Sequence, residues 1–250
     1  APDLLITVGG NLVSKSIKKV LRKHPPKFHW HFSKSGNMPD SFQCLTHIID
    51  AEPAEILETI SKSECYQDST DIDYAGKWRI LSDALPLPGK DLPFSDITVT
   101  GSFMRKLPEN STLMVGNSSS VRNIHLYPLQ DSIKVFCNRG TNGIEGSVST
   151  AIGYTSVHEG HTFLMVGDLS FFYDINSIWY NNTPANLHIL LINNGGGGIF
   201  HFLPGLEKAE SMEKFVSASH TTSAEGWVKA AGLDYLKADS DISLESALQE

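Results

Sequence analysis

From Ser95 onward, short apolar runs alternate with amphipathic segments, and this alternation constrains the fold more than any other feature of the sequence. The runs STLMVGN, IKVFCN, HTFLMVGD and LHILLINN are predicted to be strands. Helices are expected between and around them, over residues 95–106, 119–127, 147–157 and 170–180. Strands that alternate with helices form a parallel sheet with helices on both faces, so the predicted fold class is α/β.

The rest of the chain divides at a polar, proline-bearing stretch. Residues 1–63 show a βαβ pattern, with strands LLITVG and FHWHFS around a helix over 13–24, followed by the apolar THIID and the helical PAEILETISKS. Residues 64–94 are predicted to form a linker that contains one helix, near 74–85. Residues 95–250 are predicted to form a second domain, which ends with the helical stretches SMEKFVSAS and SAEGWVKAAG, a short strand DYLKA and a helix SLESALQE.

Charge and cysteine content narrow the class of protein. The chain has 20 Lys and Arg against 28 Asp and Glu, which argues against a nucleic-acid partner because phosphate binding needs clustered positive charge. Only KSIKKVLRKH is locally basic, and we interpret it as the solvated face of a short helix. No apolar run reaches the length of a membrane helix, so no integral membrane segment is expected. Three cysteines without a short-spaced pair favour neither disulfides nor zinc, and they favour a cytoplasmic location.

Asp168 and Asn194 follow two consecutive predicted strands, at the edge of a parallel sheet where ligands bind. A carboxylate at a helix N-terminus, an amide oxygen and a backbone carbonyl turned inward by glycine are ligands suited to a magnesium ion that holds a diphosphate. Taken singly, Asp168 could be an ordinary N-cap, and Asn193-Asn194 an ordinary turn. Their combination at neighbouring strand ends favours the metal and diphosphate site.

This order of motifs resembles the GDG…NN fingerprint of the thiamine-diphosphate-dependent enzymes, with Leu169 in place of the last glycine. GDLSFFYDINS and NNGGGGIFHFLP resemble the branch of that family that acts as a synthase in menaquinone biosynthesis. The resemblance implies that Asp168, Asn194 and the carbonyl of Gly196 bind Mg²⁺ or Mn²⁺. The cofactor contacts that it implies are Ile144, Gly167, Asp168, Leu169, Ser170, Asn194 and Gly196, with Ile144 beneath the thiazolium ring.

Two more segments carry the same resemblance: GNSSSVR at 116–122 and NRGTNGIEG at 138–146. With them, the matching motifs cover most of residues 95–205 in the same order. The substrate contacts implied by the resemblance are Ser118, Arg122, Arg139, Ile199, Phe200 and Leu203. The planar fork of arginine suits carboxylates, which both substrates of the branch, 2-oxoglutarate and isochorismate, carry. Without the resemblance, each arginine could equally form a surface salt bridge, and Ile144 could be ordinary core packing.

The resemblance implies a transferase that decarboxylates 2-oxoglutarate and adds the succinyl unit to isochorismate, and that forms a homodimer or homotetramer. The alternatives are another thiamine-diphosphate 2-oxoacid decarboxylase or synthase, against which Leu169 and the two arginines argue, and a non-catalytic module that retains the fold. Residues 1–63 would be the C-terminal part of a central domain and residues 95–250 the diphosphate- and metal-binding domain, truncated at its C-terminus. The family's activating Glu belongs to a further domain, and no Glu here matches its motif, so no catalytic residue is expected and this C-terminal portion should be inactive alone.

Two histidine-bearing stretches are not expected to bind metal. HEGH at 158–161 is one residue short of the HExxH spacing and precedes a strand rather than lying in a helix. HWHF at 29–32 alternates along a strand, and its histidines are predicted to face solvent.

Overall fold

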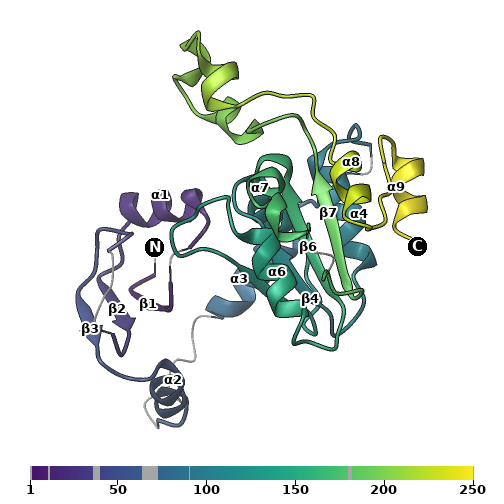
Figure 1. Ribbon diagram of the computed structural model, residues 1–250. Helices are drawn as coiled ribbons and strands as arrows, with labels where there is room; N and C mark the ends of the chain where they lie inside the picture. The colour runs from purple at the N-terminus through teal and green to yellow at the C-terminus, as the bar shows by residue number, and fades with distance from the viewer. Residues whose placement is uncertain are drawn as a thin grey trace. The chain divides into compact units, whose positions relative to one another are not determined.

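The computed structural model describes residues 2–10, 12–35, 40–63, 73–89, 91–179 and 182–249. The chain forms two compact units, Ala1–Leu85 and Pro86–Glu250, shown in Figure 1. Residues 64–72 and 90 of the predicted linker, which include Cys65, and the expected helix end at Tyr180 lie outside the described residues. Cys44 and Cys137 are free thiols. No helix in the described part of the chain is long and apolar enough to cross a membrane.

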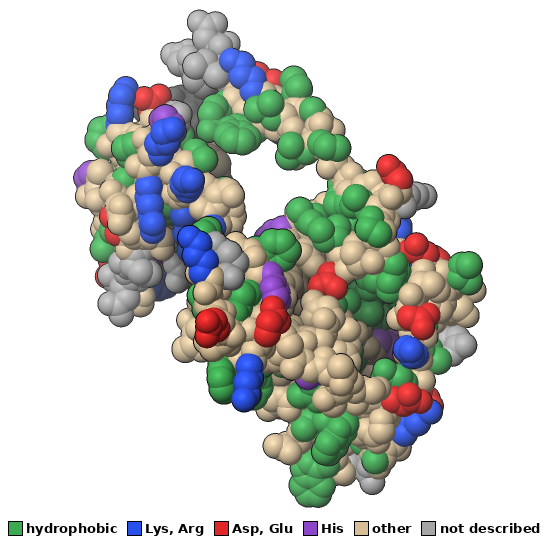
Figure 2. Space-filling view, turned by 90° about the horizontal axis from the view of Figure 1, so that it is seen from above, with side chains coloured by type: hydrophobic (Ala, Val, Ile, Leu, Met, Phe, Trp, Pro, Cys, Tyr) green, Lys and Arg blue, Asp and Glu red, His purple; other side chains and the backbone are tan. Residues whose placement is uncertain are grey.

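The first unit contains a parallel three-stranded sheet with strand order β1-β2-β3, as the βαβ pattern predicts. Its strands are β1 (Leu4–Val8), β2 (Phe28–Phe32) and β3 (His47–Ile49), and its helices are α1 (Lys15–Lys23), α2 (Pro53–Ser61) and α3 (Tyr74–Asp83). The Ser14 hydroxyl accepts a hydrogen bond from the Ile17 amide at 3.2 Å and so begins α1. Lys and Arg side chains gather over this unit (Figure 2), and no residue of α1 is buried, which confirms a solvated basic helix face.

The two histidines of β2 are buried, so the expectation that they face solvent is wrong. His29 is 0% exposed and His31 is 3% exposed. Thr7 of β1 lies between them, with its hydroxyl 2.9 Å from His29 Nε2 and 3.0 Å from His31 Nδ1. On the opposite face of β2, Phe32 is buried and Trp30 is half-buried, so alternation along this strand does not separate a buried face from a solvated one.

The second unit contains a four-stranded, wholly parallel sheet with strand order β5-β4-β6-β7, which confirms the predicted α/β class. The strands are β4 (Thr112–Val115), β5 (Lys134–Cys137), β6 (Thr162–Gly167) and β7 (Leu187–Ile192). The α-helices are α4 (Asp96–Lys106), α5 (Ser119–Asn123), α6 (Ser147–Thr155), α7 (Asp168–Tyr173), α8 (Glu225–Ala230) and α9 (Asp241–Ala247). Shorter helical turns occupy Ile124–Leu126, Ile175–Ser177, Gly198–Phe202, Leu206–Lys208 and Met212–Val216.

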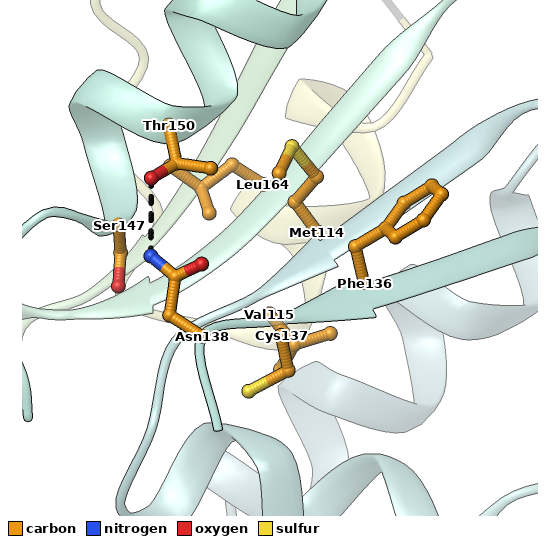
Figure 3. A pocket seen from close by; sticks show the side chains of 8 residues that line it. All are labelled: Met114, Val115, Phe136, Cys137, Asn138, Ser147, Thr150 and Leu164. Atoms are coloured by element: carbon orange, nitrogen blue, oxygen red, sulfur yellow. Dashed lines mark hydrogen bonds between the residues drawn. The ribbon is translucent and has the colours of Figure 1, made fainter. Parts of the chain in front are cut away.

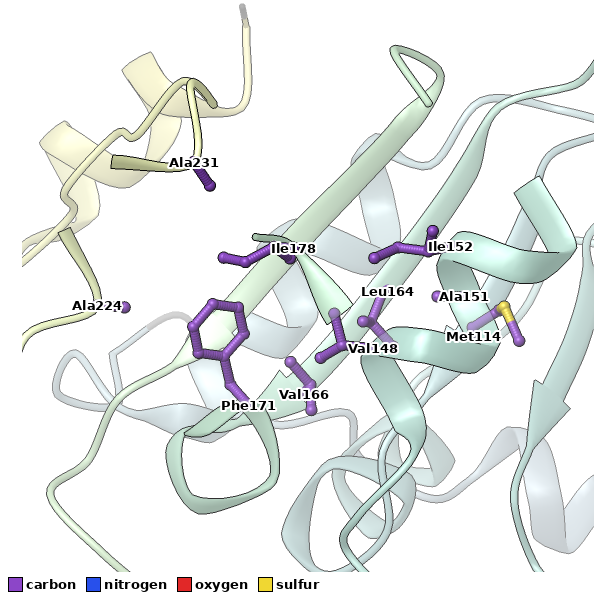
Figure 4. Packing of buried hydrophobic residues seen from close by; sticks show 10 residues of the cluster. All are labelled: Met114, Val148, Ala151, Ile152, Leu164, Val166, Phe171, Ile178, Ala224 and Ala231. Carbon is purple, nitrogen blue, oxygen red and sulfur yellow. The ribbon is translucent and has the colours of Figure 1, made fainter. Parts of the chain in front are cut away.

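Alternate residues of β6 pack against helices on opposite faces of this sheet. Leu164 and Val166 belong to a buried cluster with side chains of α6 and α7, seen in Figure 4. On the other face, the Phe163 ring lies edge-on to Phe103 of α4, with ring centroids 6.1 Å apart. Both faces of the strand are therefore covered, which explains why the strand is apolar without alternation.

Several expected elements differ in the structure. The helix expected from residue 170 begins earlier, at Asp168, and ends at Tyr173 before a 3-10 turn. DYLKA is not a strand: Tyr235 packs partly buried against the core cluster, and this packing explains its apolar pattern without a strand ladder. The last helix begins at Asp241, because the Ser240 side chain accepts from the Ser243 amide and caps it there.

Candidate functional site

A hollow of about 110 Å³ lies at the carboxyl ends of β4, β6 and β7, in the loops that lead into helices. Among the residues predicted to contact ligand, those that line it are Ser118, Ile144, Gly167, Asp168, Leu169, Ser170, Asn194, Gly196 and Phe200. Four others, Arg122, Arg139, Ile199 and Leu203, are not among its lining residues. The sheet therefore brings together most of the predicted site, including all of the proposed metal ligands.

Asp168 is held at the junction between two neighbouring strand ends. Gly167 at the end of β6 pairs with Ile192 at the end of β7, so the residues that follow them are close. Asp168 is buried, with 2% of the residue exposed, and its Oδ2 accepts hydrogen bonds from the amides of Gly195 at 2.8 Å and Gly196 at 2.9 Å. The N-cap of α7 is Gly167, so Asp168 is not an ordinary N-cap.

The glycines after Asn194 are required by a close backbone approach. Gly195 and Gly196 have φ values of +83° and +144°, which residues with a Cβ rarely adopt. A Cβ on Gly196 would lie 2.7 Å from the Ser217 carbonyl oxygen. The Gly197 amide donates to that same oxygen at 2.6 Å, and the His220 amide donates to the Gly195 carbonyl at 2.9 Å. The glycine run therefore allows the backbone at Ser217 and His220 to pack closely against the turn that follows β7.

Two residues at this turn, Asp96 and His220, belong to none of the motifs identified in the sequence. Asp96, the first residue of α4, accepts a hydrogen bond from Asn194 Nδ2 at 2.8 Å, although the two are 98 residues apart. His220 Nε2 lies 3.3 Å from Asp168 Oδ2, without an aligned hydrogen bond to any described residue. Asp96 has the sequence context of an ordinary helix start, and His220 lies in a polar loop, so only the fold brings them to the site.

Arg122 lies in α5 and Arg139 in the loop after β5, and both contact residues that line the hollow. Arg122 Nη1 donates to the Ser118 carbonyl, and Arg139 Nη1 donates to Asn117 Oδ1 at 2.7 Å. Burial, and then the nearby charge of Arg139, lowers the pKa of Arg122. Neither arginine forms an ion pair with a carboxylate among the described residues. Two half-buried positive charges that repel each other are well suited to a bound anion.

Ser118 has a strained backbone at the edge of the same hollow. Its φ of +71° and ψ of −127° lie in a region that residues with a Cβ rarely occupy. Such strain is found mostly at functional sites, because the surrounding structure must enforce it. The Arg122 hydrogen bond to the Ser118 carbonyl helps to hold this conformation.

The donor set fits a hard cation. Asp168 offers carboxylate oxygens, Asn194 an amide oxygen and Gly196 a backbone carbonyl, and all three residues line one hollow together with a second carboxylate, Asp96. Asp168 Oδ2 already accepts two glycine amides, whereas Oδ1 accepts only the Leu169 amide and keeps a second lone pair for a cation. Within the described ranges no three His, Cys, Asp or Glu side chains gather as a metal site, and the predicted set needs only one such residue.

A second hollow, shown in Figure 3, lies beneath the loop that follows β5. Its volume is about 10 Å³, and Asn138 Nδ2 donates across its rim to Thr150 Oγ1 at 3.1 Å. The nearby Ser147 hydroxyl is buried and has no hydrogen-bond partner among the described residues. A space of this size holds about one water molecule, so it is too small for a substrate or cofactor.

The fold and the hollow define an α/β protein with a polar site at the carboxyl ends of its parallel strands. No family model matches the chain. Curated relatives do match it: the 2-succinyl-5-enolpyruvyl-6-hydroxy-3-cyclohexene-1-carboxylate synthase of Phocaeicola vulgatus is 45% identical over 249 residues, which is 100% of this chain and 44% of that protein. The synthase of the same name from Bacteroides fragilis is 47% identical over 249 residues, 99% of this chain and 44% of that protein.

A third relative with the same name, from Bacteroides thetaiotaomicron, is 43% identical over 248 residues, 99% of this chain and 44% of that protein. The chain is therefore homologous over its whole length to part of these synthases, and the resemblance expected from its motifs is confirmed. The chain spans less than half the length of the curated relatives it matches.

Proposed function

We propose that this chain supplies the diphosphate- and metal-binding part of a thiamine-diphosphate-dependent synthase of menaquinone biosynthesis. The synthase would decarboxylate 2-oxoglutarate and add the succinyl unit to isochorismate. The single observation that carries the proposal is the meeting of Asp168, Asn194 and Gly196 around one hollow at neighbouring strand ends. Similarity to curated synthases along the whole chain supports the choice of this branch.

Asp168, Asn194 and the Gly196 carbonyl would hold Mg²⁺ or Mn²⁺, which bridges the protein to the diphosphate. When bound, thiamine diphosphate supplies the electron sink for decarboxylation, and the protein supplies orientation and electrostatics. Ile144 lines the hollow, and its carbonyl accepts a hydrogen bond from the Ser170 hydroxyl. This bond fixes the loop after β5 to α7, so that the Ile144 side chain would be held in position to support the thiazolium ring of the cofactor.

Ser118, Arg122 and Arg139 would bind the substrate carboxylates. The two arginines place two positive charges near each other, with no acidic partner among the described residues. A bound substrate carboxylate would offset their mutual repulsion. Phe200 forms an apolar part of the wall, because it lines the hollow from the helical turn Gly198–Phe202. Ile199 and Leu203, in and after the same turn, would complete this wall.

The decisive test is metal-dependent binding of thiamine diphosphate to the chain, measured by isothermal titration calorimetry. Asp168→Ala should lower the affinity by at least about tenfold, since changes around a metal ligand commonly cost 10- to 100-fold. Asp174→Ala is the matched control, because Asp174 follows the same helix and instead accepts from the Ser149 amide. Equal affinity of the wild type and Asp168→Ala would refute the metal site.

Two alternatives remain distinguishable by substrate. Another thiamine-diphosphate decarboxylase would bind the cofactor, but isochorismate would not raise its melting temperature. A non-catalytic module would bind neither the cofactor nor isochorismate. Thermal shift measurements with 2-oxoglutarate and isochorismate, on the wild type and on Arg122→Lys and Arg139→Lys, separate these cases. Lysine keeps the charge but loses the bidentate fork, so both variants should weaken substrate binding more than cofactor binding.

A further inference from the structure

We infer that Asp96 is a positioning residue: its carboxylate holds the Asn194 amide so that the amide oxygen, and not the amide nitrogen, is available to the metal. The observation is the hydrogen bond from Asn194 Nδ2 to Asp96 Oδ2 at 2.8 Å, at a point where both residues line the hollow. The inference rests on the proposed function, because it assigns Asn194 the role of a metal ligand.

The chemistry of the two groups fixes the direction of this contact. An ionised carboxylate can only accept hydrogen bonds, whereas an amide has a donor end and an acceptor end. The NH₂ end of Asn194 must therefore face Asp96, and the opposite end, Oδ1, remains for another partner. Mg²⁺ takes oxygen ligands, so a reversed amide would set two oxygens against each other at Asp96 and present hydrogens to the cation.

Asp96 stands on a rigid support. Ser95 and Thr98 form a capping box at the start of α4, and the next turn of the helix is packed on the sheet, with Thr100 0% exposed. The Tyr127 hydroxyl donates to the Ile97 carbonyl at 2.7 Å. A hydrogen-bond acceptor carried by a fixed helix can orient a side chain more accurately than one carried by a loop.

The strand-end turn is thus held from two sides by two carboxylates. Asp168 fixes its backbone through the amides of Gly195 and Gly196, and Asp96 fixes the side chain of Asn194. Partners of this kind, one step beyond the metal ligands, set ligand orientation in metal sites.

The alternative for Asp96 is a carboxylate that only stabilises a helix start. Asp241 provides the comparison, because it occupies the same place in α9, after a Ser cap and within a capping box. Both carboxylates interact favourably with a helix N-terminus. Asp241, however, does not line the hollow and has no amide partner among the described residues. Asp241→Ala therefore reports the helix-start effect alone.

The experiment titrates the full chain with Mn²⁺ in the presence of thiamine diphosphate and measures free Mn²⁺ by electron paramagnetic resonance. Asp96→Ala should weaken Mn²⁺ binding about tenfold. Asp96→Asn should lose less, because its amide oxygen can still accept from Asn194, and Asp241→Ala should match the wild type. Asp96→Ala introduced into Asn194→Ala should cost little more, because Asp96 acts through Asn194. If circular dichroism shows that Asp96→Ala is unfolded, Mn²⁺ binding is measured with Asp96→Asn in its place.

The possible failures are separable. Unchanged Mn²⁺ affinity in Asp96→Ala, with a loss in Asp168→Ala, would overturn this inference and leave the proposed function standing. An equal loss in the Asn194→Ala background would also overturn it, since Asp96 would then act on the ion directly. No Mn²⁺ binding by the wild type, or binding that Asp168→Ala and Asn194→Ala leave unchanged, would overturn the proposed function and this inference together.

Discussion

Both parallel sheets of this chain bury polar side chains, but at different points along the strands. In the first unit, His29 and His31 lie within the central strand, and they share the Thr7 hydroxyl of the neighbouring strand. In the second unit, Asp168 lies just beyond a strand end, and its partners are the amides of a turn that borders a hollow. A polar group within a strand finds its partners inside the sheet, whereas one at the carboxyl end can also face a ligand.

The largest expected effect concerns the turn of the second unit. Gly196→Ala forces a Cβ into a φ of +144° and against the Ser217 carbonyl, so the free energy of unfolding should fall by about 3 kcal/mol. Urea denaturation measures this loss, and hydrogen exchange should place it in β6 and β7. Gly153→Ala in α6, where an added Cβ meets nothing within 4 Å, should instead be neutral or stabilise by up to about 1 kcal/mol. A Gly196→Ala variant as stable as Gly153→Ala would show that the turn is not constrained.

A smaller loss is expected inside the first sheet. Thr7→Val keeps the shape but removes the hydroxyl between His29 and His31, which leaves buried ring nitrogens without this partner and should cost about 1–3 kcal/mol. Hydrogen exchange should show the loss in β1 and β2 and leave β6 unchanged. Thr59→Val on the exposed face of α2 is the control, and an equal loss there would remove the distinction between buried and exposed hydroxyls.

The smallest effect is a pH dependence of the first unit. Burial lowers the pKa of His29, while the charge of Asp40 opposes this in part. The unfolded chain therefore takes up a proton near the ordinary pKa of 6.5, before the folded chain does, so stability should fall as the pH drops below about 6.5. Each unit by which the pKa is lowered corresponds to about 1.4 kcal/mol. Amide exchange in β2 between pH 7.5 and 5.5 measures the loss, and constant protection would contradict a buried neutral His29.

The sequence predicted the site best where the signal was local. Asp168 and Asn194 each follow an apolar run, and their neighbouring positions follow from the pairing of consecutive strands. Arg122 lies in α5, within the helix expected over 119–127, and Arg139 lies in the loop after β5, but neither side chain is among those lining the hollow. Their orientation depends on Asn117 and Ser118, whose contacts no spacing rule specifies.

The amino-acid sequence by itself determined the order of strands and helices, the parallel α/β class and the strand ends that carry Asp168 and Asn194. These follow from periodicity and turn chemistry, which act over a few residues. Tertiary structure alone decided that the histidines of β2 are buried, that DYLKA does not pair as a strand, and that Asp96 meets Asn194 from 98 residues away. The reason is that burial and pairing depend on which residues the completed sheet places next to each segment. Asp96 in α4 and Asp241 in α9 have the same local sequence context, and only the tertiary structure places Asp96 at the hollow.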